Sequence, residues 1–205
     1  HNYNTIREYI RNFIMSKLET NQVDPSTGTT LTLGTSGDTI AIPSGVTIAN
    51  SGTATGFGGA NTPAFMATAS AQLTLTNGAS TKVQFNTEVV DTDSDYDTSN
   101  YRFTPTTAGK YNVSFSASME TTGGVGTANY AFFKLHKNGS VIHQSYTDSS
   151  NNNTYAFGGG VTAIVDMNGS SDYLEAFVTA TASSGAMKVQ NTTYTMFSAF
   201  KLIGV

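Results

Sequence analysis

Hydrophobic and polar positions follow three patterns along the 205-residue chain, and the first pattern predicts an amphipathic helix. Within residues 1–25 the apolar side chains recur at the spacing of one helical face: Ile6, Ile10, Phe13, Ile14 and Leu18. Thr5 and Glu8 fit a capping box at its start, and Pro25 marks its end. Because about four helical turns are marginal in water, we expect this stripe to dock on neighbouring subunits or on another protein. Packing on its own domain is the alternative.

Residues 26–62 show the second pattern, in which short alternating runs are interrupted by Gly, Ser, Asn or Pro. Each run carries one apolar pair, and the pairs are Leu31 and Leu33, Ile40 and Ile42, and Val46 and Ile48. One chain has nothing to place opposite so small an apolar face, whereas three chains wound together can direct the pairs toward a common axis. The pattern therefore predicts a short trimeric β stalk. A flexible linker is the alternative, but a linker does not need this matched alternation.

The third pattern, over residues 63–205, is a series of short strand-like runs without an intervening helix. Alternation is clearest over residues 111–117, where we expect the odd-numbered positions to face inward. Asn138 and Gly139 predict a two-residue hairpin, because both turn positions need a positive φ. This pattern predicts an all-β, antiparallel sandwich. The predicted runs are 64–69, 72–76, 81–86, 101–104, 110–119, 130–137, 140–147, 155–165, 173–180 and 193–202.

Composition narrows the class of protein further. Charged residues make up only 12% of the chain and aromatic residues 11%, which argues against a disordered protein. The formal net charge of −4 gives no reason to expect nucleic acid as a partner, since phosphate binding needs clustered Lys and Arg. Cysteine is absent, so we expect subunit association rather than disulfides to add stability. The sequence has no apolar run long enough for membrane insertion.

The third region also carries short motifs in a fixed order. They are an FN strand within 83–90, Tyr96-Asp97, an F-T-P strand at 101–105, a G-K-Y turn at 108–111, the KNG hairpin at 137–139, Phe157-Gly158-Gly159 and a closing F-S-A-F-K-L strand at 197–202. This series resembles the C1q-like globular head of the C1q/tumour-necrosis-factor jelly-roll superfamily. Asn100 and Ala108 depart from it, since the family has Gly and Pro there. The resemblance implies a jelly-roll fold and a tight three-fold trimer.

A second resemblance concerns residues 34–48, which read GTSGDTIAIPSGVTI and are followed by a Gly-rich run at 52–57. They stand in place of the collagen-like stalk of animal members and are similar to stalk segments of phage tail and head fibres. Together the two resemblances imply a homotrimeric virion protein of a bacteriophage, assembled in the host cytoplasm. We expect a tail fibre whose head attaches to a host surface glycan or protein and whose helix binds another virion protein. The alternatives are a capsid fibre or decoration protein without a receptor role, and a bacterial secreted C1q-like adhesin.

Polar, aromatic loops are the candidate receptor-binding elements. Their Tyr rings offer flat contacts and their Asn, Ser and Thr side chains offer adaptable hydrogen bonds, which suits weakly bound surface sugars. The candidate residues are Tyr130, Tyr146, Tyr155, Asn151 and Asn152. Glycine-rich runs at 123–126 and 158–160 lack the following helix of a phosphate loop. No spacing of carboxylates or nucleophiles predicts catalysis, so we expect no enzyme activity.

Four alternating carboxylates, Asp91, Asp93, Asp95 and Asp97, form one acidic loop. Alternating carboxylates can gather around Ca²⁺, which takes six to eight oxygen ligands. The loop fails as an EF-hand, because Tyr96 stands at its sixth position and Arg102 at its twelfth. A structural Ca²⁺ site of another geometry, completed by a neighbouring subunit, is the cofactor hypothesis. A solvated acidic loop is the alternative, and no other cofactor is expected.

Two histidines flank the predicted hairpin turn. In an unbroken register His136 and His143 share one face of the hairpin with Lys134 and Val141, and lie diagonally across the strand pair. A metal would need a third ligand that the sequence does not offer, so a surface or interface role is favoured. If they meet across a three-fold axis, trimer stability would depend on pH.

Overall fold

The computed structural model describes residues 22–52, 61–150 and 154–203 of the chain. These fall into two units, one extending to Thr53 and one beginning at Ala54, and each is described by itself. The helix predicted within residues 1–25, with its stripe from Ile6 to Leu18, lies outside the described residues. The candidate receptor residues Asn151 and Asn152 lie outside them too.

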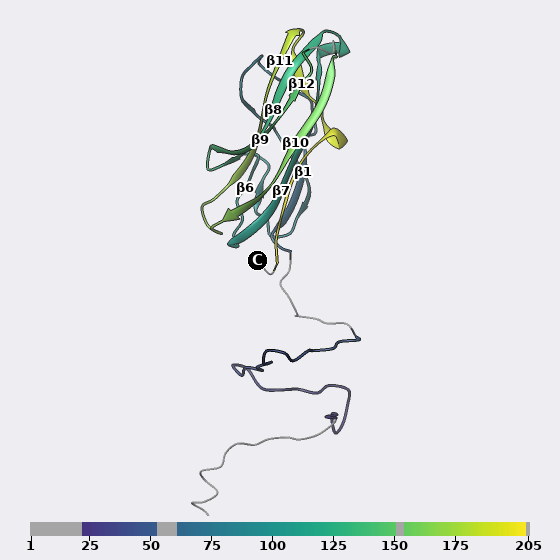
Figure 1. Ribbon diagram of the computed structural model, residues 1–205, viewed down its shortest axis with the longest axis vertical. Coiled ribbons are helices and arrows are strands. Elements are labelled where there is room, and N and C mark those ends of the chain that lie inside the picture. Colours follow the sequence, from purple (N-terminus) through teal and green to yellow (C-terminus); the bar gives the residue numbers. More distant parts are fainter. Residues whose placement is uncertain (1–21, 53–60, 151–153, 204–205) are drawn as a thin grey trace, which may run out of the picture. The chain divides into compact units, whose positions relative to one another are not determined.

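Residues 22–52 follow an extended path that is broken by turns and, in this single chain, contains no strand (Figure 1). Two of the turns repeat one geometry: the Asp38 amide donates to the Thr35 carbonyl at 3.0 Å, and the Val46 amide donates to the Pro43 carbonyl at 3.2 Å. The third residue of each turn is a glycine with φ of 95° or 85°, as a type II turn requires. The side chains of all six predicted stalk residues are exposed: Leu31, Leu33, Ile40, Ile42, Val46 and Ile48.

The second unit is a sandwich of two sheets in which every recorded strand pair of the described residues is antiparallel (Figure 1). The first sheet has the order β2-β12-β7-β13-β1-β4. β12 and β13 pair with successive parts of one edge of β7, and β10 pairs with its opposite edge. Its strands are β1 (Ala64–Thr68), β2 (Leu73–Thr74), β4 (Thr87–Asp91), β7 (Gly109–Thr121), β10 (Ala156–Met167), β12 (Met187–Val189) and β13 (Thr195–Lys201).

The second sheet has the order β5-β6-β11-β8-β9, and β3 also pairs with β11. Its strands are β3 (Thr81–Lys82), β5 (Tyr96–Asp97), β6 (Arg102–Phe103), β8 (Thr127–Lys137), β9 (Ser140–Asp148) and β11 (Leu174–Ser184). Among the described residues the helical elements are two 3-10 turns, η1 (Thr122–Gly124) and η2 (Thr192–Tyr194). None of the helices in this part of the chain is both long and apolar enough to cross a membrane.

The core lies between the two sheets and is rich in aromatic side chains. In β7 the odd-numbered residues from Tyr111 to Met119 are buried, as the alternation predicts. Phe65 stacks on Tyr96 and on Phe103, with ring centroids 4.7 and 4.4 Å apart. The Tyr96 hydroxyl donates to the Phe85 carbonyl at 2.9 Å, so this buried polar group has a partner.

Each of the ten predicted runs contains a strand, so the predicted all-β antiparallel sandwich is confirmed. Three strands were not predicted: β4, β5 and β12. The hairpin turn is confirmed as well, because Asn138 and Gly139 have φ of 52° and 79°.

The predicted register of the hairpin is wrong beyond its first two pairs. His136 pairs with Val141, but a bulge follows, and Leu135 pairs with His143. Because Leu135 is fully buried in the core, the extra residue moves His143 to the inner side of the sheet, away from His136 on the outer side. The two histidines therefore do not form the predicted diagonal pair within one subunit.

Candidate functional site

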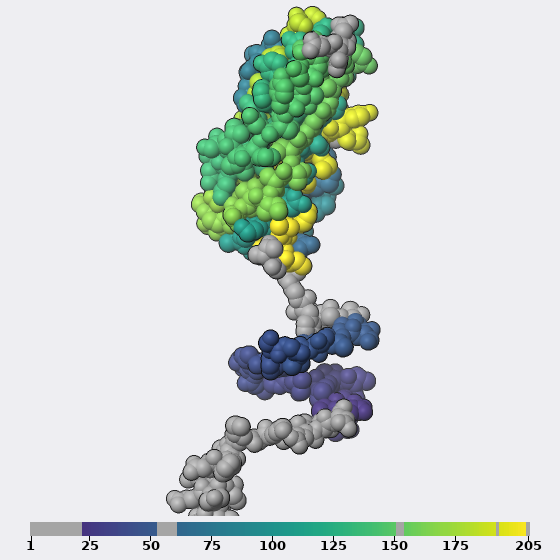
Figure 2. Space-filling view, in the orientation of Figure 1, coloured from purple at the N-terminus to yellow at the C-terminus, as the bar shows by residue number. Residues whose placement is uncertain are grey.

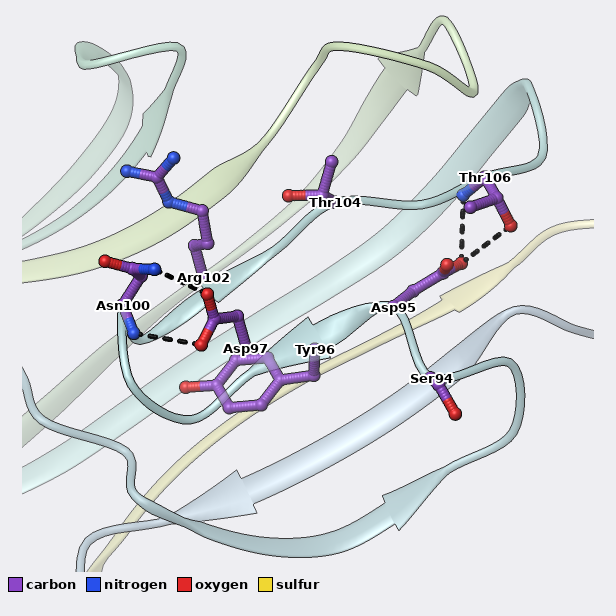
Figure 3. Close-up of a pocket in the computed structure, with 8 residues that line it drawn as sticks. All are labelled: Ser94, Asp95, Tyr96, Asp97, Asn100, Arg102, Thr104 and Thr106. Atoms are coloured by element: carbon purple, nitrogen blue, oxygen red, sulfur yellow. Dashed lines mark hydrogen bonds between the residues drawn. The ribbon is translucent and has the colours of Figure 1, made fainter.

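The acidic loop is held by its own carboxylates, each of which accepts hydrogen bonds from a different part of the chain. Asp91 accepts from the amide of Tyr96 at 2.9 Å. Asp95 accepts from the amide and hydroxyl of Thr106 at 2.9 and 3.3 Å (Figure 3). Asp97 accepts from the amides of Ser99 at 2.8 Å and Asn100 at 3.1 Å. Side-chain hydrogen bonds from Asn100 and Ser99, together with these amide bonds, hold the pKa of Asp97 well below its usual range. Burial raises the pKa of Asp95 instead.

These bonds provide Asp91, Asp95 and Asp97 with donors from the protein itself. Within the described ranges, no three acidic or histidine side chains gather in a way that could hold a metal ion. Asp91 and Asp97 instead accept from amides two to five residues ahead, as Asp commonly does in loops and turns, and Asp95 joins the loop to Thr106. A Ca²⁺ site completed by a neighbouring subunit stays a prediction, and Ca²⁺ titration followed by thermal melting tests it.

A polar hollow of about 390 Å³ lies beside this loop and is lined by residues of β5, β6 and their flanking loops (Figure 3). Arg102 lines it, but its guanidinium already donates to Glu175 at 3.2 Å and lies 4.1 Å from the ring centre of Tyr173. The Tyr96 hydroxyl and the Asp97 carboxylate are engaged as well. Most of the polar groups here thus serve the loop itself, so we assign the hollow a structural role.

The second sheet carries three aromatic side chains side by side on its outer face, and we call Tyr130, Phe132 and Tyr146 the aromatic patch. Tyr130 and Phe132 are successive outward positions of β8, and Tyr146 of β9 pairs with Phe132. The ring centroids lie 5.8 Å apart for Tyr130 and Phe132, 5.9 Å for Tyr130 and Tyr146, and 4.9 Å for Phe132 and Tyr146. The Tyr146 side chain is 53% exposed. Tyr130 and Phe132 are half-buried, so the patch is open to solvent mainly at Tyr146, on the edge strand β9.

Charged and polar groups border the aromatic patch on both sides. The Lys134 ammonium lies 5.7 Å from the Phe132 ring centre and donates to the Thr179 hydroxyl at 2.8 Å. On the other side, Asp148 accepts from the hydroxyl and amide of Ser150 at 2.6 and 2.9 Å, and these bonds lower the pKa of the Asp148 carboxyl. The patch therefore combines ring faces with a carboxylate that stays ionised near neutral pH.

The structure brings together two of the five predicted receptor residues, Tyr130 and Tyr146. Tyr155 lies elsewhere, at a hollow of about 290 Å³ that Glu120 and Tyr194 also line. Sequence reasoning missed Phe132, although its position two residues after Tyr130 in an alternating strand places both rings on one face. That spacing was the available signal.

Comparison with known proteins identifies the head. The family model of the C1q domain matches residues 64–202. The chain belongs to the C1q domain family. The match confirms the predicted resemblance of the head, while no protein among those with curated descriptions matches the sequence.

Solved structures of low sequence identity resemble the C1q head of this chain. The globular domain of zebrafish complement 1qA is 15% identical, with 68% of this chain and 96% of that chain covered and a TM-score of 0.47. Eiger TNF from S. frugiperda is 11% identical, with 68% and 91% covered and a TM-score of 0.50. Murine APRIL at pH 5.0 is 9% identical, with 68% and 98% covered and a TM-score of 0.51. The latter two support the jelly-roll fold of the C1q/TNF type.

Proposed function

We propose that this protein is a trimeric, non-enzymatic fibre of a bacteriophage particle, whose C1q head attaches the particle to the host surface. One observation carries the proposal: the three apolar pairs of residues 31–48 are exposed in the single chain and precede a C1q domain. Such pairs favour burial between copies of the chain, because a segment this short has no apolar surface of its own to cover them. C1q/TNF domains often serve as trimeric binding or adhesion modules.

The head offers a surface that suits association between copies. On the solvent face of the first sheet, Ile164 of β10 is 66% exposed, and Phe200 of β13 and Val90 of β4 are exposed too. Between them β7 contributes Ser114 and Ser116, small uncharged residues. The centre of this face is uncharged, while the Lys110–Asp166 pair and Glu120 lie toward its two ends. Apolar side chains around an uncharged centre support burial against another subunit.

The arrangement of the chain gives each part a task in this proposal. Residues 1–25 anchor the fibre to another virion protein, residues 26–62 form the trimeric stalk, and residues 63–205 present the head to a host glycan or protein. Three heads on one stalk bind a repetitive surface by avidity, so weak single sites suffice. The protein then resides on the particle surface.

Antibody labelling of intact particles, combined with an adsorption assay, tests this role. We expect label on tail fibres, and we expect the purified full-length protein to compete with particles for host cells. Label on the capsid without competition would support the capsid-fibre alternative. Absence of label from every particle would contradict a virion role and favour a secreted adhesin.

A further inference from the structure

The outer face of the second sheet carries a cluster of three rings, of which Tyr146 is exposed and Tyr130 and Phe132 are half-buried. We infer that the aromatic patch, Tyr130, Phe132 and Tyr146, binds a chain of neutral sugars. This inference rests on the proposed attachment function and names the surface and the ligand class. β8 and β9, which supply the three rings, lie at the surface of the head (Figure 2).

The three rings point away from the core of the head. Inward positions of the same strand, Ala131 and Phe133, fill the core, so the outward rings are not required there. Tyr and Phe rings have apolar faces, and a pyranose ring has an apolar face of C–H groups that can lie against them. Because the pairs of ring centroids are 4.9–5.9 Å apart and the planes are tilted by 40–76°, the patch offers several ring faces and edges. An extended sugar chain fits such a surface better than a single small molecule.

Hydrogen-bonding side chains border the aromatic patch. Asp148 can accept hydrogen bonds from sugar hydroxyls, and Gln144, the exposed partner of Lys134 across the strand pair, can both donate and accept. The Tyr146 hydroxyl already donates to Asp148, so it offers its lone pairs as acceptors, and the Tyr130 hydroxyl adds a donor and an acceptor. A ligand rich in hydroxyl groups can hydrogen-bond to these donors and acceptors, whereas an apolar ligand would cover them without providing partners.

Charge decides between neutral and acidic sugars. Hydrogen bonds from Ser150 lower the pKa of Asp148, so its carboxylate is ionised near neutral pH and repels an anionic chain. The ammonium of Lys134, 5.7 Å from the Phe132 ring centre, balances this carboxylate, so the border of the patch has no net positive charge with which to attract an anionic chain. The patch therefore favours a neutral glycan over a uronic-acid polymer.

The open shape of the patch sets the expected strength of binding. Tyr146 is more than half exposed and the rings lie on a sheet face, so a bound sugar stays largely in water. Single sites of this kind bind weakly, and a trimer compensates by presenting three of them. Host recognition through such a patch would require a surface on which the same sugar is repeated.

Saturation-transfer NMR on the full-length protein tests the inference with defined probes. The neutral probes are cellohexaose, maltohexaose and mannohexaose, and hexagalacturonate is the acidic probe of equal length. We expect at least one neutral hexasaccharide to bind, and we expect the Tyr146→Ala variant to weaken that binding by about ten-fold or more. The matched control is Tyr194→Ala, which removes an exposed ring outside the patch and should leave binding unchanged.

Several outcomes would overturn the inference: no binding of any neutral probe, preference for hexagalacturonate, or undiminished binding by Tyr146→Ala. The mass of the variant must also be measured. A loss of subunit association in Tyr146→Ala, with Tyr194→Ala still associated, would make the patch a contact between copies instead of a glycan site. These results are separable from the fibre role, because particle labelling and host-cell competition by the unmodified protein do not depend on which surface binds.

Discussion

His136 and Phe177 stack on the outer side of the second sheet, with ring centroids 4.1 Å apart and planes inclined by 22°. His136 is buried there, and its Nε2 atom has no hydrogen-bond partner. Burial lowers the pKa of His136 below its usual value of 6.5; nearby Glu175 opposes this effect and nearby Lys134 adds to it. The folded protein thus binds a proton at this site less readily than the unfolded chain does.

This difference predicts that the protein loses stability in mild acid. Above about pH 6.5 the imidazole is neutral in both states, and as the pH falls toward the lower folded pKa the unfolded chain gains the proton first. Urea unfolding at pH 7.5 and pH 5.5, at one protein concentration, measures the loss. His136→Phe should reduce this loss, whereas the control His143→Phe, at an exposed position of the edge strand β9, should keep it. Equal losses in all three proteins would rule out His136 as the cause.

We expect the substitution Glu175→Gln to lower the unfolding free energy more than loss of an exposed ion pair does. This carboxylate is buried and accepts from Lys82 at 2.7 Å and Arg102 at 3.2 Å. Glu175→Gln leaves two cations without their anion, and because both are partly exposed we expect a loss of about 1–3 kcal/mol in unfolding free energy. Asp166→Asn, which removes an exposed pair with Lys110, should cost less than about 1 kcal/mol. Similar costs in denaturant unfolding would show that burial of Glu175 is unimportant.

The glycines of β10 predict a position-dependent effect along one strand. A Cβ atom on Gly160 would lie 2.5 Å from the Phe115 carbonyl oxygen, whereas one on Gly158 would lie 3.4 Å from the Ala117 carbonyl oxygen. Gly160→Ala must displace β7 backbone and should cost about 1–3 kcal/mol, while Gly158→Ala should be nearly neutral. Thermal melting of the two variants compares them directly, and equal melting temperatures would contradict the close contact.

The stalk predicts that apolar and polar positions differ in their effect on assembly. Leu33→Asp would place three carboxylates at one shared axis, so we expect trimer dissociation to become roughly ten-fold easier or more. Thr32→Asp adds the same charge at the adjacent, alternating position and should have little effect. Sedimentation over a range of protein concentrations measures both variants, and indistinguishable behaviour would argue for a linker.

The sequence could predict the parts of the head in which one local signal dominates. Alternation from Tyr111 to Met119 marked β7, and the Asn138-Gly139 pair marked the hairpin, because both signals are contained within a few residues. β12 was missed since three residues carry no period, and it exists because Val189 and its neighbours pair with the end of β7. The bulge opposite Leu135 was missed as well, because a one-residue shift depends on packing across the sandwich.

The residue types of the candidate site could be predicted from the sequence, but the contacts between them could not. Tyr130 and Tyr146 could be chosen from residue type, but their contact with Phe132 depends on the strand register that the bulge sets. The acidic loop shows the same limit: the alternation of Asp91 to Asp97 gives no sign of the backbone amides to which these carboxylates bind. Bonds between distant segments, such as Asp95 to Thr106, leave no periodic trace in a sequence.

Sedimentation equilibrium of the purified full-length chain tests the central claim most directly. The account predicts a species of three times the 21.6 kDa chain mass that persists on dilution, because the apolar pairs of residues 31–48 are covered only when three copies share them. A stable species of one chain mass across the same dilution series would contradict the fibre assignment.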